Sequence, residues 1–179
     1  HTLGSVPAEH ARASLAGQPE ARRRDLLKLL CLLLTTGAAG YGVQGSTPWR
    51  AAMADVHTAV GEIRHITLAD GTELDLDTGT AVNIQYTARE RRIRLVTGAV
   101  LLQSGHALPY RDRPLIVATA AGDIEALGTR FCVSEVADGT QVDLYEGALQ
   151  IRPGAAPAQR LEAGQQLWFS AQRCGPVLP

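Results

Sequence analysis

The sequence predicts an all-β domain over residues 56–170, a twisted β-sandwich or a β-solenoid-like stack of about eleven short strands, preceded by one transmembrane helix. Three observations support this prediction. Apolar residues recur with a period close to two from Val56 onward. Turn signals interrupt them about every ten residues. Before this region, a basic cluster is followed directly by a charge-free apolar stretch.

The composition limits the classes of protein that the chain can belong to. Of its 179 residues 45% are hydrophobic but only 4% are aromatic, so the core is aliphatic and large enough to disfavour disorder. The net charge of −1 excludes nucleic-acid binding through an overall basic field. Three cysteines are too few for a disulfide scaffold.

The near-zero net charge averages two unlike parts. Residues 1–50 carry six basic and three acidic side chains, a balance of +3, and the remainder carries eleven basic and fifteen acidic ones, a balance of −4. The 21 residues from Leu29 to Trp49 have no charge. The positive-inside rule therefore predicts an inner-membrane protein with a single pass, a cytoplasmic N-terminus and a periplasmic β-domain. We expect a remnant of a cytoplasmic region at 1–21, a basic cluster and transmembrane or signal-anchor helix at 22–45, and a linker at 46–55.

The basic cluster also resembles an export signal. Its residues, which we predict to set the membrane topology, are Arg22, Arg23, Arg24 and Lys28. Two arginines, any residue, two apolar residues and a lysine form the twin-arginine pattern. A small-x-small cleavage site lies about ten residues past the apolar core, too far for efficient cleavage. An uncleaved signal-anchor is therefore the preferred interpretation.

Within the β-region, alternation predicts which residues face a core. The sets that alternate with polar residues are Leu74 and Leu76; Val82, Ile84 and Tyr86; Ile93 and Leu95; and Val142 and Leu144. Asp70-Gly71 and Asp138-Gly139 are hairpin signals, because glycine adopts a positive φ without a clash of Cβ. Gly98, Gly147 and Gly164 each follow a short apolar stretch.

The residues give little indication of catalysis or metal binding. The five histidines are widely separated, at positions 1, 10, 57, 65 and 106, and no cofactor or metal is expected. Strand alternation places Glu73, Asp75 and Asp77 on one solvated face, which we favour over a calcium site with Asp70. Cys132 is expected to be a small core residue. The sequence is compatible both with a disulfide between Cys132 and Cys174 and with two free thiols.

Seven short segments occur in the order found in one protein family. They are 58–62 (TAVGE), 68–77 (LADGTELDLD), 92–99 (RIRLVTGA), 113–117 (RPLIV), 126–133 (ALGTRFCV), 142–147 (VDLYEG) and 161–166 (LEAGQQ). Over 56–170 the chain thus resembles the periplasmic domain of FecR-type regulators, an anti-sigma family of bacterial cell-surface signalling. The family-motif residues, to which we assign structural roles, are Gly61, Asp70, Gly71, Gly98, Pro114, Gly128, Thr129, Phe131, Gly147 and Gly164. Leu115 stands where the family usually has Phe.

The resemblance implies a function in signalling rather than catalysis. The family's members relay a periplasmic signal from an outer-membrane siderophore or iron receptor, a TonB-dependent receptor with a signalling domain, to a cytoplasmic extracytoplasmic-function sigma factor. Residues 171–179 would then begin a linker to a missing C-terminal domain, and the sigma-binding N-terminal region would be mostly missing. The alternative is a membrane-anchored or exported periplasmic β-module that binds a cell-envelope ligand such as a glycan. Neither interpretation makes the chain an enzyme.

Overall fold

The computed structural model describes residues 47–179, with side chains from Arg50 onward. The predicted remnant at 1–21 and the basic cluster and membrane segment at 22–45 lie outside the described residues. Helix α2 (Thr47–Ala52) opens the described part. Between residues 47 and 179, no helix is both long enough and apolar enough to span a membrane.

The remaining elements are strands, which form two sheets. We call them sheet A and sheet B. In spatial order, sheet A contains β1 (Val56–His57), β4 (Ala81–Tyr86), β5 (Arg91–Thr97), β7 (Leu115–Ala118), β8 (Gly122–Ala126), β11 (Ala148–Pro153) and β12 (Gln159–Glu162). Sheet B contains β13 (Gln166–Phe169), β10 (Gly139–Glu146), β9 (Arg130–Val136), β6 (Ala99–Gln103), β3 (Glu73–Leu76) and β2 (Arg64–Thr67). Neighbouring strands are antiparallel except β5 and β7, which run parallel.

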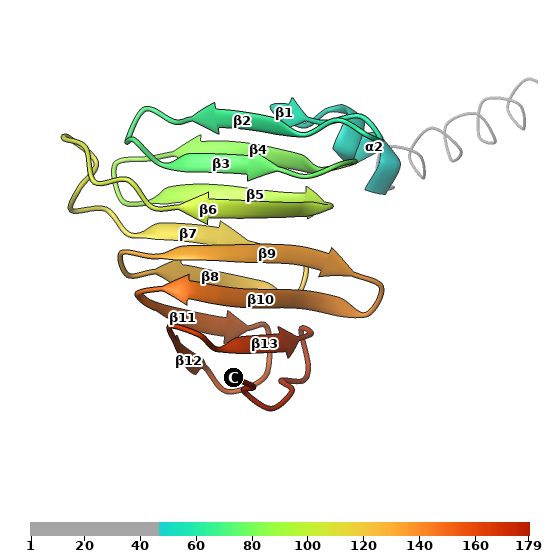
Figure 1. The fold of residues 1–179 in the computed structure, drawn as a ribbon, viewed down its shortest axis with the longest axis vertical. Helices are drawn as coiled ribbons and strands as arrows, with labels where there is room; N and C mark the ends of the chain where they lie inside the picture. The colour runs from blue at the N-terminus through green and yellow to red at the C-terminus, as the bar shows by residue number, and fades with distance from the viewer. Residues whose placement is uncertain (1–46) are drawn as a thin grey trace, which may run out of the picture. The chain divides into compact units, whose positions relative to one another are not determined.

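The strand order combines the two architectures that the sequence left open. The two sheets form a sandwich, but the chain never returns to an earlier position, because strand numbers rise from one end of each sheet to the other. In Figure 1 the colour accordingly runs from cyan at the top to red at the bottom through both layers. The chain alternates between sheets after every one or two strands, as in a solenoid. The described residues contain thirteen strands, close to the predicted number of about eleven, and the shortest of them, β1, has two residues.

The core lies between the sheets, as the alternation predicted. Every second residue of most strands is buried, and both sheets contribute to one hydrophobic cluster. Two of the largest fully buried side chains are Phe131 and Phe169, and the others are Leu and Ile. Leu115, at the position where we expected Phe in relatives, is itself fully buried. An aliphatic core therefore joins the sheets despite the scarcity of aromatic residues.

The ends of the two sheets are protected unequally. Next to β1, the backbone N–H of Ile84 donates to Asp55 Oδ2 (2.8 Å), so a side chain occupies part of the β4 edge. The chain's own C-terminal segment covers β13, through bridges that pair Gln166 with Leu178 and Phe169 with Cys174. By contrast, β2 at the end of sheet B and β12 at the end of sheet A each have a neighbour on one side only. These two edges are thus left available for pairing.

Candidate functional site

A buried carboxylate links the two sheets at one end of the sandwich. Asp70 lies in the turn between β2 and β3 and is fully buried. It accepts hydrogen bonds from Thr72 Oγ1 (2.6 Å), Thr72 N (3.1 Å) and Tyr86 Oη (2.9 Å). It also forms an ion pair with Arg91 Nη1 at 2.6 Å. The Asp-Gly motif therefore forms the turn and also supplies the buried carboxylate that binds Tyr86 and Arg91 of sheet A.

These contacts determine the protonation of the cluster. Burial by itself would raise the pKa of Asp70, but hydrogen bonds from Thr72 and Arg91 favour the carboxylate and hold its pKa below the usual value. The pKa of the Tyr86 phenol is raised, first by burial and then by its bond to the Asp70 carboxylate. The cluster is accordingly ionised at Asp70 and protonated at Tyr86 near neutral pH.

Arg91 also fastens the long connection between β6 and β7 at residues 104–114. Its Nε donates to the carbonyl of Arg113 (2.9 Å), and its Nη1 donates to the carbonyl of Gly105 (2.8 Å). The backbone N–H of Ala107 donates to the carbonyl of Asp70 (3.0 Å). The ion pair therefore holds both ends of this loop against the sandwich.

A cleft of about 420 Å³ lies beside this loop. Its charged and polar lining residues are Arg91, His106, Arg111, Asp112, Arg113 and Glu125. The turn between β8 and β9 closes the other side with Leu127 and Gly128. Charged and polar residues thus make up six of the ten residues that line the cleft, and they can bind a charged group.

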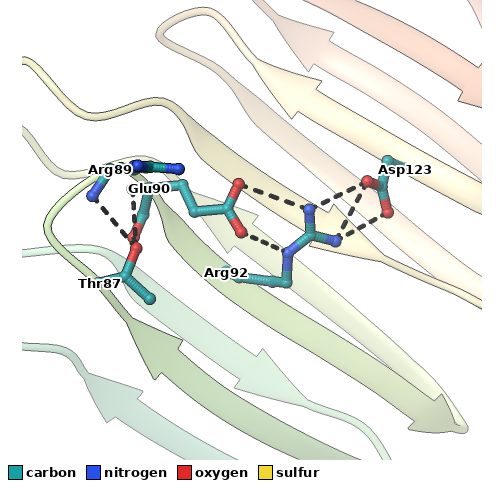
Figure 2. Close-up of polar contacts among 5 residues, drawn as sticks. All are labelled: Thr87, Arg89, Glu90, Arg92 and Asp123. Carbon is teal, nitrogen blue, oxygen red and sulfur yellow. Dashed lines mark hydrogen bonds and ion pairs between the residues drawn. The ribbon is translucent and has the colours of Figure 1, made fainter.

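A second polar cluster lies on the outer face of sheet A. Arg92 lies between two carboxylates, donating to Glu90 Oε1 (2.7 Å) and to both oxygens of Asp123 (3.0 and 3.1 Å), as Figure 2 shows. The two acids raise the pKa of its guanidinium. Because 22% of the Arg92 side chain and 39% of Asp123 are exposed, water screens these pairs, which serve the surface of the sheet rather than a site.

The family-motif residues are dispersed over the fold. The glycines 61, 71, 98, 128, 147 and 164 all have φ between +78° and +87°, as their turn roles require. Phe131 is fully buried, and the carbonyl of Pro114 accepts from the Arg91 N–H. Thr129 is buried, with no partner for Oγ1 among the described residues. Only Asp70, Pro114 and Gly128 meet at the cleft and its buried cluster, and Arg22, Arg23, Arg24 and Lys28 lie outside the described residues.

Sequence reasoning missed Arg91 and the role of Tyr86. A signal for Arg91 was present, because it has the same parity as Ile93 and Leu95 and therefore points inward. An arginine at an inward position of a strand requires a buried acid as its partner.

The two cysteines at 132 and 174 are free thiols. The prediction that Cys132 belongs to the core is wrong. It alternates with the buried Phe131 and Val133, so it lies on the outer face of sheet B and is half-buried. There it lines a shallow hollow of about 250 Å³. Burial raises the pKa of its thiol, which lowers its reactivity. In the part of the chain from 47 to 179, no group of three His, Cys, Asp or Glu residues is placed to bind a metal ion.

The fold has solved counterparts. Two crystal structures, at 1.65 and 2.50 Å resolution, contain a Parabacteroides distasonis ATCC 8503 protein provisionally called an anti-sigma factor. Each superposes with a TM-score of 0.58 at 24% identity over 69% of this chain, a likeness that shows a shared fold. The chain spans only 57% of the length of those proteins. No curated protein matches the sequence.

The family model described as FecR protein matches residues 54–150, more than half of the chain. The matched region begins just before β1 and ends in β11, and it includes the buried Asp70–Arg91 pair. The chain therefore belongs to the FecR protein family.

Proposed function

We propose that this protein is a single-pass inner-membrane regulator that relays a periplasmic signal to an extracytoplasmic-function sigma factor in the cytoplasm. Its membership of the FecR family carries this proposal. The shared fold with proteins provisionally called anti-sigma factors supports it. The basic cluster at 22–28 and the uncharged stretch after it support the membrane topology. In this proposal the protein acts by binding and not by catalysis.

The partner on the periplasmic side is the signalling domain of an outer-membrane TonB-dependent receptor for iron or a siderophore. The edge of β2 supports such a contact. Leu68 N donates to the Thr72 carbonyl, so by antiparallel alternation His65 and Thr67 direct their backbone N–H and C=O groups away from β3. No residue between 47 and 179 bonds to these four groups. An extended segment of a partner can add to this edge as a seventh strand.

A pair of substitutions at one residue tests this contact. Thr67→Pro removes the outward N–H of the edge, and an edge position without a ladder bond tolerates proline. Thr67→Val keeps that N–H and removes only the hydroxyl group. We expect Thr67→Pro to abolish co-purification with the receptor's signalling domain and Thr67→Val to preserve it. If both variants retain the domain equally, β2 is not part of the interface.

The sigma-factor link needs its own experiment. The complete reading frame, co-expressed with candidate extracytoplasmic-function sigma factors, should retain one of them through its cytoplasmic region. Failure to retain any sigma factor would contradict the regulator and would favour the alternative, an envelope β-module that binds a glycan. Separately, alkaline phosphatase fused after Pro179 should be active, because the enzyme requires the oxidising periplasm. A well-expressed but inactive fusion would contradict the topology.

A further inference from the structure

One of the residues that line the cleft beside residues 104–114 has a guanidinium group with an unused nitrogen. Arg91 lines the cleft although only 5% of its side chain is exposed. Its Nε is bonded to the Arg113 carbonyl, and its Nη1 is bonded to Asp70 and to the Gly105 carbonyl. Its Nη2 has no hydrogen-bond acceptor anywhere in residues 47–179. Two N–H groups of a buried cation are therefore free to meet a ligand.

The charges around that nitrogen leave a positive balance. The Asp70 carboxylate already neutralises Arg91, and the Arg152 guanidinium pairs with Glu125 at 2.7 Å. The charged lining residues left over are Arg111, Asp112 and Arg113, with His106 beside them. Two cations and one anion remain, so the potential in the cleft favours an anion.

The rim cations differ in how firmly they are held. Arg113 Nη1 donates to the Thr87 carbonyl (2.8 Å), and its guanidinium lies over the Tyr110 ring, 5.2 Å from the centroid. Arg113 is thus positioned by the protein before any ligand binds, whereas Arg111 is exposed and adaptable. A pre-positioned cation and an exposed, adaptable one can together bind a small anion.

We propose that this cleft binds the oxyanion of a small ligand, a carboxylate or a phosphate group, between Arg91 Nη2 and the guanidinium groups of Arg111 and Arg113 on the rim. Guanidinium groups match the planar geometry of such oxyanions, and partial burial strengthens these charge-assisted hydrogen bonds. The volume of about 420 Å³ lies within the range of small-molecule sites. This inference does not depend on a sigma factor or on a receptor.

The site can be tested by ¹H–¹⁵N NMR on the 179-residue chain, titrated separately with succinate and with inorganic phosphate at constant ionic strength. We expect saturable shifts at the amides of Gly105, Leu127 and Gly128 with at least one of the two probes. Binding of succinate alone would identify a carboxylate ligand, and binding of phosphate alone would identify a phosphate ligand. The absence of a saturable shift with either probe would overturn the proposal.

Two arginine variants test the assignment of residues. Arg111→Gln removes a rim cation at an exposed position and should weaken binding about tenfold. Arg160→Gln removes an exposed cation from β12, outside the cleft, and should leave binding unchanged. Equal weakening by both variants would reveal nonspecific charge attraction and overturn the site. Arg91→Lys, with its fold checked by circular dichroism, should weaken binding at least as much, and Arg111→Gln decides the question even if that variant unfolds.

Discussion

Arg91 and Asp70 form an ion pair of 2.6 Å inside the sandwich, with 5% and 0% of their side chains exposed. Asp70 belongs to a turn of sheet B, and Arg91 opens β5 of sheet A. The pair therefore connects the two sheets by an ion pair, whereas the rest of the core connects them by aliphatic packing. It also fixes the loop that forms the cleft.

Removing one partner of this pair should be costly. Asp70→Asn leaves the Arg91 charge buried without a counter-charge, so the free energy of unfolding should fall by about 3–5 kcal/mol. Urea denaturation followed by circular dichroism measures this change. Asp123→Asn is the matched control, since 39% of Asp123 is exposed, and it should cost under about 1 kcal/mol. Similar losses in the two variants would mean that burial does not govern the pair.

The same carboxylate should make stability depend on acid pH. The pKa of Asp70 is lower in the folded protein than the ordinary value of about 3.9, so the unfolded chain binds more protons in this range. Its contribution to stability is complete above that ordinary value and is lost as the pH falls from there through the lower pKa of the folded protein. Glu135 acts oppositely, because burial raises its pKa. Glu135 is present in both proteins, whereas only wild type has the Asp70 carboxylate. Between about pH 6 and pH 3, wild type should therefore lose more unfolding free energy than Asp70→Asn does. An equal loss would show that another group governs the acid limb.

Alanine substitutions at two glycines distinguish the cost of backbone strain from the cost of a steric clash. Gly61 and Gly98 both have φ +87°, but a Cβ at Gly61 meets nothing within 4 Å, whereas one at Gly98 lies 2.5 Å from Thr80 Cα. Gly61→Ala should cost about 1–2 kcal/mol for the left-handed backbone alone. Gly98→Ala should cost clearly more, because the Thr80 backbone must also move. Thermal denaturation of both variants measures the difference, and equal costs would contradict the close approach.

The surface pairs of Arg92 should contribute little. A double-mutant cycle with Arg92→Ala and Asp123→Ala should give a coupling of about 0.2–1 kcal/mol, since both side chains are partly exposed. The coupling should shrink in 1 M salt, where the Debye length is about 3 Å. A coupling energy above this range that does not change with salt would show that Arg92 stabilises the fold as Arg91 does.

Two buried threonines should respond in opposite ways to the loss of a hydroxyl. Thr129 Oγ1 has no hydrogen-bond partner among the described residues, so Thr129→Val should leave stability unchanged or raise it. Thr72 Oγ1 donates to Asp70 and accepts from the Gly105 N–H (3.1 Å), so Thr72→Val should cost about 1–3 kcal/mol. Urea denaturation of both variants tests this, and a large loss in Thr129→Val would reveal a partner for its hydroxyl.

Most of the architecture follows from local patterns. A period of two selects strands and their buried faces, as for Leu74 and Leu76, because successive side chains of a strand point to opposite sides. Asp-Gly and lone glycines select turns, because they tolerate positive φ. The same rule placed Cys132 on the outer face, opposite Phe131, where its hydrophobic character alone had suggested the core.

The sequence by itself thus determined an all-β domain, most of its aliphatic core, its turns and its family. Only the tertiary structure decided that the strands divide into two sheets of rising order, and that Asp70 faces Arg91 across 21 residues. The period of a strand tells which face a residue occupies but not which strand lies opposite. Partnership between sheets depends on how two twisted layers pack, and that packing brought Asp70, Arg91 and the loop at 104–114 together around the cleft.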